Sequence, residues 1–199
     1  MPLRAASWTV VDRDDDVALV VAARGGQLRA QEALFRKYAP LVNGLAFRLM
    51  GNREDLDDLV QDIFLQAFRS LERLENPAVF RNWLSEIVVR MACNLMRRRR
   101  LLTRFGLRTG APIDVDAMIA PTAPPDVACA LAATYRVLQG LPAKVRVALV
   151  LRRVEGRQLA EVASLMGASL ASVKRWLRAA DRALGTAVVG EAGKEKARR

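Results

Sequence analysis

The chain has 199 residues, of which 52% are hydrophobic and 27% charged, so it can form one or two compact cores but no large enzyme framework. Lys and Arg number 32 against 21 Asp and Glu, and the formal net charge of +11 predicts a polyanionic partner, most simply a nucleic acid. The sequence contains no His, which excludes imidazole catalysis and Cys/His zinc sites.

The sequence also indicates where the protein acts. Cys93 and Cys129 form no C-x-x-C pair, which fits a reducing cytosol and small buried side chains. The N-terminus lacks the pattern of a signal peptide, and no uncharged apolar run is long enough to span a bilayer. We therefore expect a cytoplasmic protein without membrane contact of its own.

Four helices are predicted in the N-terminal half, after a tail of residues 1–11 without periodicity. Asp14, Asp15 and Asp16 are expected to cap the first helix, which stops at Gly25 and Gly26. Apolar residues recur every three or four positions in the later helices, and the second places Leu28 and Phe35 on its apolar side. The predicted ranges are 17–24, 27–50 with Pro40 as a possible kink, 54–71, and a fourth helix that opens at Asn76 and Pro77 and reaches the arginine run at 97–100.

A flexible linker is predicted over residues 103–125, where Gly, Pro, Thr and Ala replace helical periodicity. Helical patterns resume at Asp126 and again at Pro142, which we expect to open a helix that stops near Gly156. A shorter helix, a turn at Gly167 and a last helix from Leu170 to Leu184 follow. From Gly185 the chain is expected to fray as a small, basic tail.

The most specific local signal lies in residues 159–178, where Ala163, Gly167, Val173 and Trp176 have the offsets of a helix-turn-helix. Hydroxyl and cationic residues occupy the solvent face of its second helix: Ser169, Ser172, Lys174, Arg175 and Arg178. Residues 136–182 carry ten positive and three negative charges. We therefore expect this helix to bind the major groove of DNA, the alternative being a packing module with a charged surface.

A second signal lies on the predicted helix at 54–71, on the side away from its apolar stripe. Asp58, Gln61, Asp62, Leu65 and Arg69 share that side, and residues 51–76 carry seven acids against three bases. An acidic surface with an exposed leucine does not suit DNA, so it predicts docking to a basic protein partner. A merely solvated face is the alternative.

A third signal lies on the following helix, opposite its core stripe. This face comprises Asn82, Glu86, Val89, Arg90, Cys93, Asn94 and Arg97, and the arginine run extends it. Asn and Arg can hydrogen-bond base edges and neutralise phosphates, which predicts a second DNA contact. Phe80 and Trp83 fall on the apolar stripe and are interpreted as core residues rather than base-stacking platforms.

With these surfaces, the chain resembles the extracytoplasmic-function (ECF) sigma factors, the smallest group of bacterial RNA polymerase specificity subunits. The resemblance covers about residues 14–185. In the N-terminal half it rests on residues 33–38, 57–64 and 80–84 with the arginine run, and in the C-terminal half on residues 141–142, 154–156, 160–163, Gly167 and 172–174.

The resemblance implies an all-α fold of two small helical domains without enzymatic activity, cofactor or metal. Residues 12–102 would form the domain that docks on core RNA polymerase and melts the −10 promoter element, and residues 126–186 the helix-turn-helix domain that reads the −35 element. The linker 103–125 joins them, and residues 1–11 and 187–199 form tails.

The resemblance also assigns partners to the three surfaces. Asp58, Gln61, Asp62 and Leu65 would dock on the clamp helices of the largest polymerase subunit, and the flap is a further polymerase contact. Non-template single-stranded DNA of the −10 element would meet Asn76, Asn82, Arg90, Asn94, Arg97 and Arg98. Duplex −35 DNA would meet Ser169, Ser172, Lys174, Arg175 and Arg178. An anti-sigma factor is an expected partner, competing for the same apolar and acidic surfaces.

The chain departs from the family at two DNA-facing positions, since the family usually has Asn where this chain has Arg90 and often Asp where it has Asn94. Its promoter preference therefore does not follow from the resemblance.

Two other functions fit parts of the sequence. A dimeric helix-turn-helix regulator of duplex DNA explains residues 126–184 but leaves the acidic surface without a role. A metal-dependent nuclease or recombinase could use Asp55, Asp58 and Asp62, since carboxylates at a four-residue spacing, as in Asp58 and Asp62, can share a Mg²⁺ ion. The sequence shows no third convergent acid, catalytic Tyr or activated Ser for such chemistry.

Overall fold

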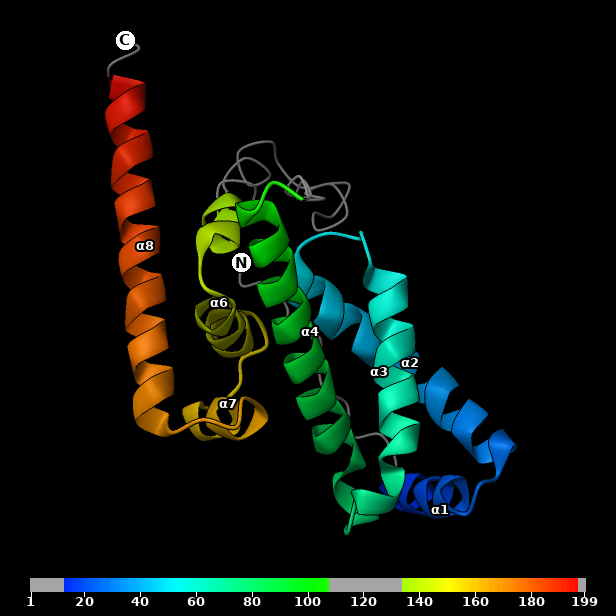
Figure 1. The fold of residues 1–199 in the computed structure, drawn as a ribbon. Coiled ribbons are helices and arrows are strands. Elements are labelled where there is room, and N and C mark those ends of the chain that lie inside the picture. Colours follow the sequence, from blue (N-terminus) through cyan, green and yellow to red (C-terminus); the bar gives the residue numbers. More distant parts are fainter. Residues whose placement is uncertain (1–12, 108–133, 197–199) are drawn as a thin grey trace, which may run out of the picture. The chain divides into compact units, whose positions relative to one another are not determined.

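A computed structural model describes residues 13–107 and 134–196, and within these ranges the chain is helical and contains no strand (Figure 1). This confirms the predicted all-α class. The chain divides into two compact units, one ending at Leu95 and the other beginning at Met96. No helix in the described ranges is long and apolar enough to cross a membrane. The predicted tail at 1–11, Cys129 and most of the predicted linker at 103–125 lie outside these ranges.

The four helices predicted for the N-terminal half are all present. They are α1 (Arg13–Arg24), α2 (Leu28–Met50), α3 (Leu56–Arg69) and α4 (Phe80–Arg104), with short 3-10 turns η1 (Leu71–Arg73) and η2 (Pro77–Val79) before α4. Helix α1 begins earlier than predicted, so Asp14, Asp15 and Asp16 lie in its first turn rather than before it. Negative charge is favourable there because the N-terminus of a helix carries a partial positive charge.

Glycines end α1 and α2 as predicted. Gly26 has φ +82°, and Gln27 beyond it returns a backbone hydrogen bond to Ala22 at 3.2 Å. Gly51 has φ +75°, and its N–H donates to the carbonyl of Phe47 at 2.7 Å. Such left-handed residues satisfy the last carbonyls of a helix at little steric cost. Pro40 is accommodated inside α2.

The core of the first unit forms where the apolar faces of its helices meet. Its fully buried side chains include Leu34, Val42, Leu45, Leu49, Ile63, Phe80, Leu84, Ile87 and Val88. Phe80 meets the ring of Tyr38 edge-on, with the centroids 5.1 Å apart, and burial of such a ring contributes about 1.5–3 kcal/mol. Leu28 and Phe35 were expected in this core but are 78% and 42% exposed, because both lie at the edge of the buried arc of α2.

A polar contact joins α1 to α2. The hydroxyl of Tyr38 donates to Oδ2 of Asp16 at 2.6 Å, and Nζ of Lys37 lies 2.7 Å from Oδ1 of the same carboxylate. Burial raises the pKa of Tyr38 above its ordinary value, and the bond to Asp16 raises it further, so the hydroxyl remains a donor. The guanidinium of Arg24 donates to the carbonyl of Leu74, which attaches the end of α1 to the loop that precedes α4.

The second unit contains the predicted C-terminal helices. Residues 134–140 are helical, followed by α6 (Ala143–Leu149), a π-helical turn η4 (Val150–Val154), α7 (Leu159–Leu165) and α8 (Leu170–Lys196). Tyr135, Leu138, Val145, Leu149 and Ala180 form a buried cluster with Trp176 packed against it. Helix α8 continues beyond the predicted end at Leu184, because an isolated Gly185 weakens a helix without ending it.

Candidate nucleic-acid and protein interfaces

The turn between α7 and α8 has the geometry of a helix-turn-helix. Gly167 adopts φ +54°, its N–H donates to Ser164, and the N–H of Ala168 returns to the carbonyl of Ala163 at 2.9 Å. Ala163 and Val173 are buried, and Trp176 packs on the core cluster. The small, left-handed and buried apolar positions of the motif are thus occupied by Ala163, Gly167 and Val173 at the predicted offsets.

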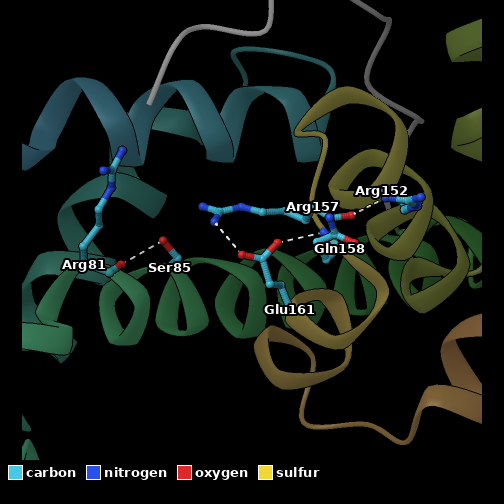
Figure 2. Close-up of polar contacts among 6 residues, drawn as sticks. All are labelled: Arg81, Ser85, Arg152, Arg157, Gln158 and Glu161. Carbon is cyan, nitrogen blue, oxygen red and sulfur yellow. Dashed lines mark hydrogen bonds and ion pairs between the residues drawn. The ribbon is translucent and has the colours of Figure 1, made fainter. Parts of the chain in front are cut away.

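The N-terminus of α7 is held by a polar network that sequence reasoning missed (Figure 2). The N–H of Gln158 donates to Oε2 of Glu161 at 2.7 Å, and Nη1 of Arg157 lies 3.8 Å from Oε1 of the same carboxylate. Arg152 in turn donates to the carbonyl of Arg157 at 2.9 Å. The three-residue spacing from Gln158 to Glu161 is the signal that could have revealed this capping arrangement. Within this network, Glu161, an acidic residue of the helix-turn-helix, forms an ion pair with Arg157.

The predicted DNA-reading face of α8 begins with a serine cap. Oγ of Ser169 accepts the N–H of Ser172 at 3.2 Å, and the two hydroxyl oxygens lie 3.1 Å apart. Lys174, Arg175 and Arg178 are exposed on the following turns. Asp181, the acid that follows them on α8, lies 3.6 Å from Arg153. The first three turns of α8 therefore present hydroxyl and cationic groups to solvent, as a major-groove helix requires.

The predicted protein-docking face lies on α3. Asp58, Gln61, Asp62 and Leu65 are all exposed, Leu65 to 44%, whereas Leu59, Ile63, Phe64 and Ala67 on the other side of the helix are buried. Phe64 contacts Phe35 of α2 with ring centroids 4.7 Å apart. Because α3 is anchored by this packing, its acidic face is held on a rigid helix. We call these four exposed residues the α3 docking face.

The predicted DNA-facing side of α4 is exposed at its polar positions. Asn82, Arg90, Asn94, Arg97 and Arg98 all face solvent. Val89 and Cys93 were assigned to the same face but are buried, because they lie at its edge and turn toward the core. The burial of Cys93 confirms the expectation that this cysteine is a small buried side chain. Phe80 is buried, which confirms its interpretation as a core residue. The exposed surface of α4 is therefore narrower and more basic than the sequence predicted.

Two polar residues near the start of α4 have local structural partners. Oδ1 of Asn76 accepts the N–H of Ala78 at 3.0 Å, which caps η2 as predicted and leaves the residue exposed. Ser85 is buried, and its Oγ donates to the carbonyl of Arg81 at 2.9 Å (Figure 2). Burial raises the pKa of Glu86, an effect that Arg90 opposes. A local hydrogen bond thus orders the turn at Asn76 that leads into α4.

The end of α4 exposes two apolar side chains, Leu101 at the end of the predicted first domain and Phe105 in the predicted linker. Leu101 is 54% exposed and Phe105 is 68% exposed. The N–H of Phe105 still donates to the carbonyl of Leu101 at 3.1 Å, so helical structure continues two residues past the predicted start of the linker at Thr103. The signal for these positions was their spacing, since 97, 101 and 105 share one helix face.

Asp55, Asp58 and Asp62, the acidic residues considered for metal chemistry, do not come together as a metal site in the described residues. Asp55 has φ +59° at the start of α3, and Asp58 and Asp62 are exposed on the docking face. In the part of the chain that the structure covers, no three His, Cys, Asp or Glu side chains are arranged to hold a metal ion.

Two family profiles match the chain: Sigma-70 region 2 over residues 34–101 and Sigma-70, region 4 over residues 131–184. The ECF RNA polymerase sigma factor SigM of Mycobacterium tuberculosis is 31% identical over 160 residues, which cover 80% of this chain and 77% of that protein. The chain belongs to the ECF RNA polymerase sigma factors. The RNA polymerase sigma factor CarQ of Myxococcus xanthus is 34% identical over 149 residues, covering 73% of this sigma factor and 82% of CarQ.

Further comparisons agree with this assignment. The ECF sigma factor SigE of Mycolicibacterium smegmatis is 30% identical over 175 residues, and the match spans 66% of SigE. The structure of CnrH, solved with the cytosolic domain of CnrY, is 25% identical with a TM-score of 0.58 and covers 88% of this chain and 97% of CnrH. The fold is also that of RpoE from Bartonella quintana, at 21% identity and a TM-score of 0.60, over 79% and 95% of the two chains. The matches in both halves favour the sigma factor over the duplex-binding regulator.

Proposed function

We propose that this sigma factor recruits core RNA polymerase to two promoter elements and opens the DNA at one of them. Residues 12–102 would dock on the polymerase and hold the −10 element, and residues 126–186 would read the −35 element. The observation that carries this proposal is the presence of three exposed surfaces, one acidic and two basic, on the three helices α3, α4 and α8. No covalent chemistry is assigned to the chain, because the polymerase makes the RNA.

Docking would use the α3 docking face against the clamp helices of the largest polymerase subunit, with the flap as a further contact. Two aspartates, an amide and a leucine fit a basic partner helix that offers an apolar side chain at its centre. The packing of Phe64 on Phe35 supports this role, because it holds α3 in place without using the exposed residues.

Strand opening would use the loop at Asn76 and the exposed side of α4. Asn82 and Asn94 offer amides to base edges, and Arg90, Arg97 and Arg98 offer cations to phosphates. The loop at Asn76 is braced by its capping bond, so it could receive a flipped base of the non-template strand without first becoming ordered.

Reading of the −35 duplex would use α8. Arg175 and Arg178 can form bidentate contacts with guanine, and Ser169, Ser172 and Lys174 can hold phosphates. Because Oγ of Ser169 already caps the helix, this serine contributes to the contact chiefly by fixing the orientation of the first turn. The ion pair of Asp181 with Arg153 supports the same role, since it reduces the negative charge near the DNA.

An anti-sigma factor is the proposed regulatory partner, acting in the cytoplasm. CnrH, which this chain resembles over 97% of the length of CnrH, was solved in complex with the cytosolic domain of CnrY. A sigma factor of this size can therefore be held by a second protein. Such a partner would cover the acidic and apolar surface of α3 and thereby exclude the polymerase.

Reconstitution with core RNA polymerase, followed by sequencing of transcript starts, tests the proposal. The native chain should yield starts at defined promoters that share two upstream elements. Arg175→Gln should reduce use of the −35 element about 10-fold, the effect of one bidentate contact, while polymerase affinity stays unchanged. Asp62→Asn should instead reduce polymerase affinity. Absence of promoter-specific transcripts, or an Arg175→Gln protein with native promoter use, would contradict the proposed function.

A further inference from the structure

The exposed side of α4 continues beyond its asparagines and arginines into two apolar side chains. Taking Arg90 as the origin, the exposed residues Asn94, Arg97, Arg98, Leu101, Arg104 and Phe105 follow at offsets of 4, 7, 8, 11, 14 and 15. These offsets describe one face of a helix about 22 Å long. The face that we assign to DNA therefore ends in Leu101 and Phe105, to which the proposed function gives no role.

Phe105 is presented by an ordered helix end. The N–H of Phe105 donates to Leu101, Gly106 adopts φ +69°, and the N–H of Leu107 returns to the carbonyl of Leu102 at 2.9 Å. This is the left-handed helix termination that satisfies the last carbonyls of α4. The ring of Phe105 is 68% exposed even though its backbone is held by these bonds. The ring is therefore exposed from a backbone whose position is fixed by helical hydrogen bonds on both sides of Phe105.

The surroundings of the ring favour a nucleic acid as its ligand. Arg97, Arg98, Arg100 and Arg104 are exposed on the same two turns, and residues 87–107 include no acid. An apolar protein surface would have to bury or pair these cations, whereas phosphates separated by unstacked bases match both the charges and the ring. Every base offers a flat apolar face, so the contact would not require a particular sequence.

We propose that Phe105 and Leu101, surrounded by Arg97, Arg98 and Arg104, form an accessory site that stacks an unpaired base of single-stranded DNA. The inference rests on the proposed DNA-facing role of α4 and extends it to the helix end. Phe105 supplies the ring on which a base stacks, Leu101 supports the apolar surface one turn earlier, and the arginines hold the adjoining phosphates.

Binding of fluorescent oligonucleotides by the full chain tests the site. The ligands are an oligothymidine of about 12 nucleotides and an abasic strand with the same phosphates, because a stack requires bases and an ion contact does not. Phe105→Ala should weaken oligothymidine binding about 5- to 150-fold, leave the abasic strand unaffected, and be rescued by Phe105→Tyr. Leu107→Ala is the matched control, because Leu107 is 74% exposed two residues away. It should bind like the native chain.

The outcomes separate this inference from the proposed function. Arg98→Gln should lower the salt dependence of oligothymidine binding by about 0.7 in the logarithmic slope, and Phe105→Ala should leave the slope unchanged. If the native chain and Arg98→Gln bind oligothymidine equally weakly, the proposed role of α4 itself fails. If the arginine variant weakens binding and Phe105→Ala does not, only the stacking site fails. The stacking site would also be overturned if Phe105→Ala weakened binding of the abasic strand and of oligothymidine equally. Tighter binding of an oligouridine than of oligothymidine, or a Phe105→Ala protein that loses affinity only for core polymerase, would likewise overturn it.

Discussion

Substitutions on the α3 docking face should separate apolar from electrostatic contributions to polymerase binding. Leu65 is 44% exposed, so its packing within the fold is already about half complete. Full burial of a leucine contributes about 1.5–3 kcal/mol, and covering the remaining exposed part therefore contributes about 1 kcal/mol. Leu65→Ala should weaken binding to core polymerase about fivefold. The helix should be retained, because alanine is the best helix former, and loss of the half-buried contacts should lower the free energy of unfolding by only about 1 kcal/mol.

Asp62→Asn tests the charge on the same face. Its side chain is exposed, so the effect on polymerase affinity should be about two- to fivefold at low salt and should disappear near 1 M salt, where the screening length falls to about 3 Å. The effect of Leu65→Ala should persist at high salt, because apolar contacts are not screened. The two variants are thus distinguished by salt dependence as well as by affinity.

Fluorescence anisotropy of the labelled sigma factor, titrated with core polymerase at two salt concentrations, measures both effects. Val21→Ala is the matched control, because Val21 is 54% exposed on α1, outside the proposed face. It should leave affinity unchanged. Native affinity in both Leu65→Ala and Asp62→Asn would show that α3 is not the docking surface. A loss of helicity in Leu65→Ala would refute the argument that this side chain faces solvent.

Three further variants test the described fold. Tyr38→Phe should lower the free energy of unfolding by about 1.5–3 kcal/mol in urea titrations, because it removes the hydroxyl bonded to Asp16; an unchanged midpoint would contradict this. Gly167→Ala should lower the free energy of unfolding by about 1–2 kcal/mol in thermal unfolding, since φ is +54° and there is open space around an added Cβ. Gly185→Ala, which lies inside α8, should instead raise it. Stability changes of the same sign in the two variants would refute the turn geometry. Burial raises the pKa of Glu86, so folding favours its neutral form, and ionisation reduces stability as the pH rises above about 4.3. Glu86→Gln should therefore be more stable than the native chain at about pH 7 and equally stable below about pH 4. A stability difference that does not change with pH would contradict this.

Several elements were predictable because their signals are local. The stripe on α3 predicted both its buried side and the exposed Asp58, Asp62 and Leu65, since the helical period assigns each residue to a face once the helix is recognised. The helix-turn-helix was predictable for the same reason. Its turn requires a left-handed residue at Gly167, and the presence of glycine at that position is visible in the sequence.

Other features depended on what the helices pack against. Phe35 was expected in the core and is 42% exposed, whereas Val89 and Cys93 were assigned by periodicity to the DNA-facing side of α4 and are buried. All three lie at the boundary between a buried and an exposed arc, where periodicity alone does not assign burial. The position of a neighbouring helix decides how wide the buried arc becomes.

By itself, the sequence determined the all-α class, the helix order, the exposed acidic face of α3 and the basic faces of α4 and α8, because charge and helical period are properties of the individual residues and their spacing. Only the tertiary structure showed that Tyr38 and Asp16 join α1 to α2, and that Arg152, Arg157 and Glu161 brace α7. Only its backbone bonds showed that α4 extends to an ordered end presenting Phe105. Such contacts depend on the direction in which each side chain and carbonyl points, and that direction is set when the helices pack and end.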